Sequence, residues 1–159
     1  MTKKLLERLN GECKAMEHEL KAVLPDEISK AAALGDLSEN AEYEAALDRQ
    51  RLLQSKIRAL KSRISDISVI DVNRLPVDKI GYGSVVTVMD LEDDHEVTYQ
   101  LVMPEDADAA RGRISISSPI GRALVGRTPG DEVSIPIPSG IKNFEILEMT
   151  TYSNTDQDL

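Results

Sequence analysis

Apolar residues recur at steps of three and four along the first 70 residues of the chain. The first run comprises Leu6, Leu9, Cys13, Met16, Leu20 and Val23. The second run comprises Tyr43, Ala46, Gln50, Leu53, Ile57, Leu60, Ile64 and Ile67. Such steps place apolar side chains along one helix face and are typical of the a/d seam of a coiled coil. The pattern predicts two long helices that share a seam.

Pro25 interrupts the first run, which resumes at Ile28, Ala31 and Leu34. A proline inside a helix removes a backbone hydrogen bond and clashes with the preceding turn. We therefore expect one helix that is kinked or briefly interrupted at Pro25 and ends at Gly35. Because a short turn between two long helices forces them antiparallel, residues 1–72 are predicted to form a coiled-coil hairpin arm.

Beyond residue 70 the chain alternates apolar and polar residues, which is the period of a β-strand. Proline and glycine residues within 73–83 predict a linker, followed by a second domain over 84–152. The predicted strands cover 84–91, 96–103, 113–117, 132–137 and 143–149. A polar segment, 153–159, is predicted to be a flexible tail.

Ser118 and Pro119 predict the start of a short helix that runs through Leu124, with Gly126 after its end. The expected fold class is therefore α+β. It comprises an N-terminal antiparallel α-helical hairpin and a C-terminal antiparallel β-sheet domain that packs around one short helix.

Charge and cysteine content narrow the function classes. The 159 residues carry a net charge of -9, which argues against a protein that attracts nucleic acid through its own field. Cys13 is the single cysteine and excludes an internal disulfide, as expected in a reducing compartment. An exposed thiol without a role is its simplest interpretation. Because no segment approaches the about 18 apolar residues of a membrane span, we expect a soluble, cytoplasmic protein without membrane contact.

Asp36 and Glu39 lie in the predicted turn, and their spacing leaves two interpretations open. In the first, they form a helix capping box, with Asp36 as the cap and Glu39 at the third helical position. In the second, two carboxylates on an exposed turn complete the coordination of a hard divalent ion. Two carboxylates hold Mg²⁺ weakly, so such a turn would have to join a site that supplies further ligands, as two-metal phosphodiester hydrolysis requires.

Two blocks of sequence resemble the signatures of the GreA/GreB family of bacterial transcript-cleavage factors, and most closely its GreA branch. The first is Gly35-Asp36-Leu37-Ser38-Glu39-Asn40-Ala41-Glu42-Tyr43, followed by Glu44-Ala45-Ala46. The second is Ile114-Ser115-Ile116-Ser117-Ser118-Pro119-Ile120-Gly121-Arg122-Ala123-Leu124-Val125-Gly126-Arg127. The blocks stand in the family's order, and the resemblance covers nearly the whole chain.

The resemblance implies a transcription elongation factor whose C-terminal domain is similar to the FKBP fold. That domain would dock on the rim of the RNA polymerase secondary channel, and the arm would enter the channel. Asp36 and Glu39 would share a Mg²⁺ ion with the polymerase active site and promote cleavage of a backtracked nascent RNA 3′ segment. The protein would thereby rescue arrested complexes as an accessory factor, with no enzyme activity or cofactor of its own.

The resemblance assigns further residues, each with a structural alternative. The docking region matches Ser117, Ser118, Pro119 and Arg122. Helix-start chemistry also explains the serine-proline pair. The tip-positioning residues would be Leu37, Asn40 and Tyr43. Leu37 could instead close the hairpin, and Tyr43 could pack in the seam.

Arg49, Lys56 and Arg63 follow heptad spacing on the second helix. They form either a stripe close to RNA or a solvated face that pairs with acidic residues of the first helix, namely Glu7, Glu12, Glu17 and Glu19. The family usually has basic residues near the tip where this chain has Ala32 and Leu47. The segment between Pro25 and Gly35 is also shorter than is usual in the family.

Two other functions compete with cleavage stimulation. A regulator that occupies the channel would inhibit the polymerase without inducing cleavage. A prolyl isomerase would need an aromatic-lined pocket, for which the C-terminal domain offers Phe144 and scattered tyrosines. Because the arm can satisfy its own seam, a monomer is expected.

Overall fold

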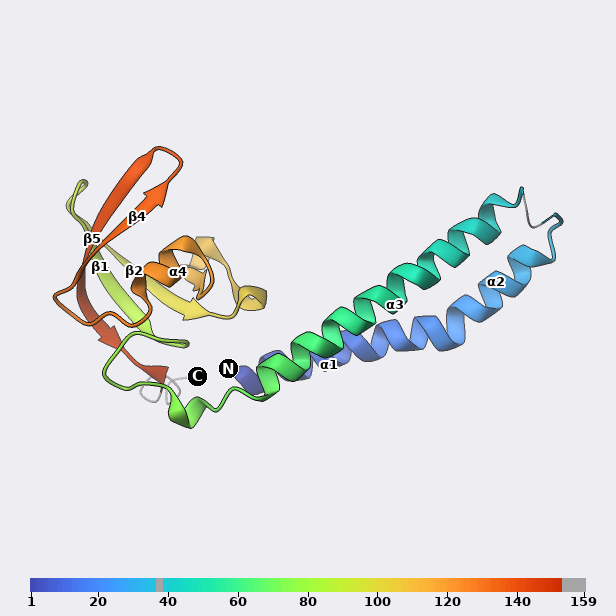
Figure 1. Cartoon of the computed structure of the whole chain (residues 1–159), viewed down its shortest axis with the longest axis horizontal. Coiled ribbons are helices and arrows are strands. Elements are labelled where there is room, and N and C mark those ends of the chain that lie inside the picture. The colour runs from blue at the N-terminus through green and yellow to red at the C-terminus, as the bar shows by residue number, and fades with distance from the viewer. Residues whose placement is uncertain (37–38, 153–159) are drawn as a thin grey trace. The chain divides into compact units, whose positions relative to one another are not determined.

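The computed structural model describes residues 1–36 and 39–152, so Leu37 and the predicted tail 153–159 lie outside the described residues. The chain divides into two compact units. One is Thr2–Ile70, and the other is formed by Met1 and Asp71–Leu159. The first unit is a pair of helical legs, and the second holds a β-sheet with a short helix (Figure 1).

The first leg of the arm is a helix with a wider turn near its middle. It runs through α1 (Thr2–His18), η1 (Glu19–Val23) and α2 (Leu24–Ala32). In the π-helical η1, the Leu24 N–H donates to the Glu19 carbonyl five residues back. Pro25, which follows directly, cannot donate a backbone hydrogen bond, and its ring crowds the carbonyl four residues earlier. The interruption expected at Pro25 is therefore confirmed, and it takes the form of a π-helical turn.

The π-helical turn shifts the buried face by one position. Leu5, Leu9 and Cys13 are buried in α1, whereas Val23 is 40% exposed and Leu24 is fully buried. Repeated steps of four outrun the 3.6-residue period of an α-helix, and the additional residue in a π-turn compensates for that drift. The seam position predicted at Val23 is therefore wrong. The interpretation of Cys13 as an exposed thiol is also wrong, because Cys13 packs in the seam and is 5% exposed.

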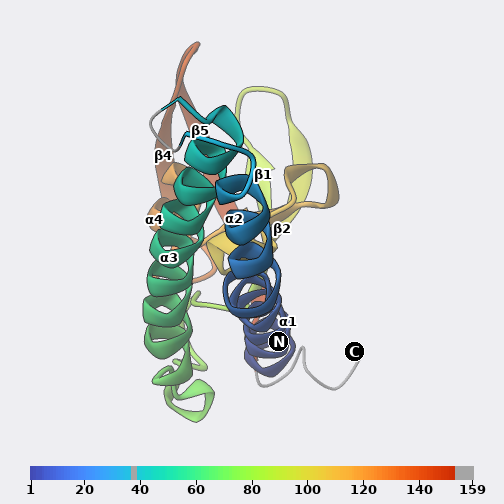
Figure 2. The same ribbon diagram turned by 90° about the vertical axis from the view of Figure 1, so that its right-hand side faces the viewer.

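The second leg is α3 (Ala41–Ser68), whose buried residues are Leu53, Ile57 and Ile67. The two legs lie side by side and antiparallel, which confirms the predicted hairpin (Figures 1 and 2). The first leg ends earlier than predicted, because the Leu34 N–H bonds to the Ala31 carbonyl in a tightened last turn.

Among the described helices, none is long and apolar enough to span a membrane.

The second unit contains a five-stranded sheet in the order β3-β2-β1-β5-β4. Its strands are β1 (Val85–Asp90), β2 (His95–Val102), β3 (Arg113–Ser115), β4 (Glu132–Ile137) and β5 (Gly140–Thr150). The pairings are antiparallel, as expected, except that β3 runs parallel to β2. The connection that reverses direction twice contains η3 (Pro104–Asp106) and η4 (Ala109–Arg111). It returns the chain to the level of Gln100, so that β3 runs in the same direction beside the last three residues of β2.

The sheet packs its apolar face against α4 (Pro119–Leu124), the short helix expected from the sequence. Gly121 lies in this helix, and a Cβ atom there would be 2.1 Å from the carbonyl oxygen of Ser115, so the close approach requires glycine. Ile80 is 1% exposed and belongs to the same core. The segment 73–83, expected to be a linker, therefore contributes packing to the second unit. The short helix η2 (Val72–Arg74) overlaps its start.

Candidate functional site

The end of the arm carries the two carboxylates on an exposed turn. The turn begins at Gly35, whose φ of 145° is a conformation that favours glycine. The Glu39 N–H donates to the Asp36 carbonyl over 3.4 Å. Both Asp36 and Glu39 are exposed. The turn therefore presents two carboxylate residues at the surface, three positions apart.

Asn40 caps the second leg of the arm. Its side-chain Oδ1 accepts a hydrogen bond from the Tyr43 N–H over 3.0 Å, and α3 begins at the next residue, Ala41. A capping box that starts at Asp36 would begin the helix four positions earlier, so that interpretation is wrong. The sequence held the correct signal, because asparagine is as strongly preferred at an N-cap as aspartate.

Asn40 also bonds across the hairpin. Its Nδ2 donates to the Ala31 carbonyl in the last turn of α2, at 2.5 Å. Of the predicted tip-positioning residues, Asn40 therefore touches both legs, Tyr43 is half-buried in α3, and Leu37 lies outside the described residues. Sequence reasoning missed Ala31, because a backbone carbonyl leaves no signal in the amino-acid pattern.

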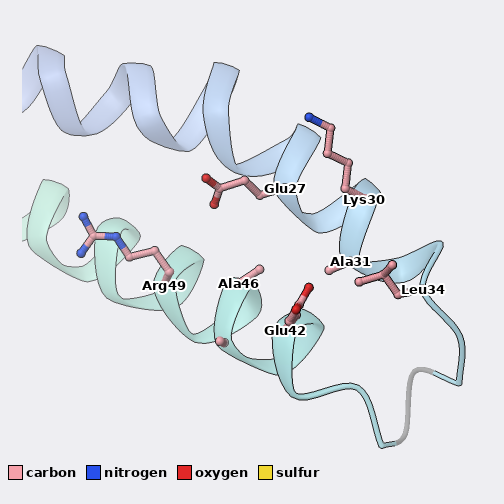
Figure 3. Close-up of a pocket in the computed structure, with 8 residues that line it drawn as sticks. Glu27, Lys30, Ala31, Leu34, Glu42, Ala46 and Arg49 are labelled. Atoms are coloured by element: carbon pink, nitrogen blue, oxygen red, sulfur yellow. The ribbon is translucent and has the colours of Figure 1, made fainter.

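A hollow of about 510 Å³ separates the legs next to this turn. Ala31 and Ala46 point into it from opposite legs, and Glu42 points into it from α3 (Figure 3). Arg49 lines its inner end, and Leu34 lies at its outer end. Small side chains thus leave the arm thinly packed where it carries the carboxylates.

Ion pairs cross the hairpin further from the turn. Arg49 makes two hydrogen bonds to the Glu19 carboxylate, at 2.8 and 2.9 Å, and lowers the pKa of that carboxyl. Lys61 lies 2.5 Å from Glu17 and lowers its pKa in the same way. Of the predicted basic stripe, Arg49 is paired with the opposite leg, as the solvated-face alternative expected, and the charge of Lys56 also lowers the pKa of Glu19.

The predicted docking residues lie at the start of α4. Ser118 is its N-cap, with Oγ accepting the Gly121 N–H at 3.0 Å and donating to the Ser115 carbonyl at 2.6 Å. The Arg122 guanidinium donates to the Ser117 carbonyl at 2.6 Å. Helix-start chemistry therefore accounts for Ser118 and Pro119. Ser117, Pro119 and Arg122 are exposed, and Ser118 is half-buried.

A second acidic group, missed by the sequence reasoning, lies at the turn between β1 and β2. Ligand atoms of Asp90, Asp93 and His95 lie within 4.8 Å of one another. The Lys142 ammonium also lies 2.5 Å from Asp90 and 3.0 Å from Asp93. A cation of the chain itself therefore balances these carboxylates, and the partner from β5 could not be found from local spacing.

Comparisons with known proteins cover both units. A family model described as "Transcription elongation factor, N-terminal" matches residues 1–69, and one described as "Transcription elongation factor, GreA/GreB, C-term" matches residues 75–151. Transcription elongation factor GreA of Acidiphilium cryptum is 42% identical over 92% of this chain and 94% of its own length. GreA of Vibrio parahaemolyticus is 45% identical over 80% of this chain and 82% of its own. A solved GreA/GreB structure from Nitrosomonas europaea is 30% identical, with a TM-score of 0.43, over 60% of this chain and 79% of that chain.

Proposed function

This chain belongs to the GreA/GreB family of transcription elongation factors, and on that basis we propose that it stimulates RNA cleavage by a stalled RNA polymerase. The arm enters the secondary channel of the polymerase and brings its acidic turn to the active site. The polymerase then cuts the backtracked 3′ segment of the nascent RNA, and elongation resumes from the new end.

The observation that carries this proposal is the setting of Asp36 and Glu39. Both lie exposed on the turn between two long helices, and the capping of α3 is done by Asn40. Helix capping therefore does not explain why two acidic residues lie at the end of the arm. An exposed pair of carboxylates at the end of a long hairpin is suited to act inside a partner.

The donor set fits a shared Mg²⁺ ion. Carboxylate oxygens are the ligands that Mg²⁺ prefers, and a site often uses one or two of them. When bound, the ion would polarise a phosphoryl oxygen and lower the pKa of an attacking water. Asp36 would contribute a direct or water-mediated contact, and Glu39 would orient the water. The remaining ligands would come from the polymerase, so the protein needs no metal of its own.

The second unit provides the docking surface in this proposal. Ser117, Pro119 and Arg122 are exposed at the start of α4 and within it, and Ser118 is the N-cap of this helix. We assign this surface to the rim of the secondary channel. The chain then acts as an accessory factor that lends two carboxylates and leaves the catalytic centre to the polymerase.

The isomerase alternative has less support. An apolar groove beside α4 is lined by isoleucine, proline, alanine and serine residues with Arg113, and the described lining includes no aromatic residue. Phe144, the aromatic residue considered for such a pocket, is buried in the core at 5% exposure.

A cleavage assay on stalled elongation complexes with displaced RNA 3′ ends tests the proposal. Wild type should shorten the RNA, whereas Asp36→Asn and Glu39→Gln should bind polymerase normally and cleave poorly. Glu44→Gln is the matched control, since it removes an exposed carboxylate from the first turn of α3 and not from the turn itself. If wild type slows synthesis without cutting RNA, the protein is instead an inhibitory occupant of the channel.

A further inference from the structure

We propose that Asn40 is a positioning residue that sets the separation of the two legs and thereby places Asp36 and Glu39. Its amide oxygen receives the Tyr43 N–H of α3, and its amide nitrogen donates to the Ala31 carbonyl of α2. One short side chain thus ties together the helix ends on both sides of the turn. The positioning role rests on the proposed function, whereas the tie itself can be tested without polymerase.

The hydrogen bond from the Asn40 amide to the Ala31 carbonyl, which we call the tie, closes a loop that contains both carboxylates. The hydrogen bond from Asn40 to Ala31 joins residues nine positions apart, and Asp36 and Glu39 lie between them. Closing a loop restricts the conformations that its members can reach. Opening this bond would let the ends of the loop separate and would spread the two carboxylates over more positions.

Apolar packing supplies little support at this level of the arm. The nearest fully buried large side chains are Leu24 on the first leg and Leu53 on the second. From there toward the turn, Ala31 and Ala46 face the hollow between the legs (Figure 3). Since contact between apolar faces is what ordinarily holds paired helices together, a polar tie carries more of that task where the contact is thin.

Asparagine suits this position because one side chain must accept and donate in two directions. Serine and aspartate also cap helices well, so both substitutions preserve the bond from the Tyr43 N–H. Neither has an amide nitrogen to place against the Ala31 carbonyl. Asn40→Ser is neutral and Asn40→Asp adds a charge, so their shared effect isolates the loss of the tie.

Two measurements on the full chain test the inference. The first is the distance distribution between spin labels at Ser29→Cys and Glu44→Cys, two exposed positions on opposite legs, in a Cys13→Val background. The second is the RNA cleavage rate against Mg²⁺ concentration and against factor concentration. Asn10→Ser is the matched control, because Asn10 makes a similar amide bond to a carbonyl, that of Leu6, within a single leg.

Both Asn40 variants should broaden the distance distribution and lower the maximal cleavage rate by about tenfold or more, as small misplacements of catalytic groups do. They should need more Mg²⁺, while the factor concentration for half-maximal cleavage stays at the wild-type value. A purely structural loss of folded protein would instead raise that concentration and leave the Mg²⁺ requirement unchanged.

Unchanged distances, or wider distances with wild-type cleavage, would overturn the inference. A loss confined to Asn40→Asp would also overturn it, because charge and not the tie would then be responsible. If wild type itself cuts no RNA, the proposed function fails and the positioning role fails with it, and the distances alone decide whether Asn40 ties the legs.

Discussion

Two carboxylate pairs lie on turns of this chain in opposite settings. Asp36 and Glu39 are exposed at the end of the arm, whereas Asp90 is 1% exposed at the end of β1 and pairs with Lys142 together with Asp93. Asp90 also accepts the N–H groups of Glu92 and Asp93, so both of its oxygens have partners within the unit. Both pairs consist of carboxylates, and the burial of Asp90 separates a structural acidic pair from one that is suited to a partner's metal ion.

The largest expected effect is a loss of RNA cleavage when the acidic pair of the arm is changed. Asp36→Asn should lower the maximal cleavage rate by roughly 10²-fold, the cost of removing one preorganised electrostatic group, and leave the unfolding temperature near the wild-type value. Asp90→Asn should do the reverse, since it removes a buried ionic contact far from the acidic turn in sequence and in a different unit. RNA cleavage rates and thermal unfolding curves of both variants provide the measurement.

The control for this pair of variants is the binding of each to polymerase, which should match wild type. A cleavage loss with Asp90→Asn that persists at saturating factor concentration would contradict the assignment of Asp90 to structure alone.

The next effect concerns the cation that holds the second pair. Lys142→Met should lower the free energy of unfolding of the C-terminal unit, because it leaves the buried Asp90 without its charge partner. Lys61→Met is the matched control, since the Glu17 side chain that Lys61 contacts is 27% exposed against 2% for Asp90, and pairs that water reaches contribute little. Urea titrations should therefore show the greater loss for Lys142→Met.

A double variant sharpens this test. Asp90→Asn combined with Lys142→Met removes both charges, so it should be less destabilised than Lys142→Met alone. Equal stability of the double and single variants would show that the pairing of the charges is not what Lys142 contributes.

A smaller effect is the dependence of stability on pH. The hydrogen bond from Lys142, with those from the Glu92 and Asp93 N–H groups, lowers the pKa of Asp90. The unfolded chain therefore binds more protons in acid, and this stabilisation is present above the ordinary aspartate pKa of about 3.9 and is lost as the pH falls below it. Unfolding free energies measured on either side of that value should fall in acid more steeply for wild type than for Asp90→Asn. Parallel profiles for the two proteins would contradict the assignment.

The periodic elements of this fold could be predicted from the sequence, and the local departures from them could not. Heptad steps and alternation identified the two legs and the five strands, because burial of one face imposes those periods. The move of the seam from Val23 to Leu24 could not be predicted, since it depends on how the helix absorbs Pro25. The direction of β3 depends on pairing with β2 and not on any pattern within the strand itself.

In the candidate site, the residues that lie near one another in the sequence could be predicted, and the contacts between different elements could not. Asp36 and Glu39 could be identified from their turn and from the family signature. The cap could have been assigned to Asn40, which has the right residue type directly before the helix. Its bond to the Ala31 carbonyl and the position of Lys142 between two acidic residues are contacts between different elements, which the pattern within one element does not reveal.

The smallest expected effect applies the same comparison to basic residues, through Arg49 and Glu19. If the Arg49 guanidinium serves the hairpin, Arg49→Gln and Glu19→Gln should each cause a small loss of arm stability, and the double variant should lose little more. All three should cleave RNA at nearly the wild-type rate. If Arg49 instead contacts RNA, the two single variants should move cleavage in opposite directions. Arg49→Gln would lower the rate, and Glu19→Gln, which releases the guanidinium from its carboxylate, would raise it. Cleavage at low and high salt measures this sign, and opposite signs would reassign Arg49 from the paired face to the RNA path.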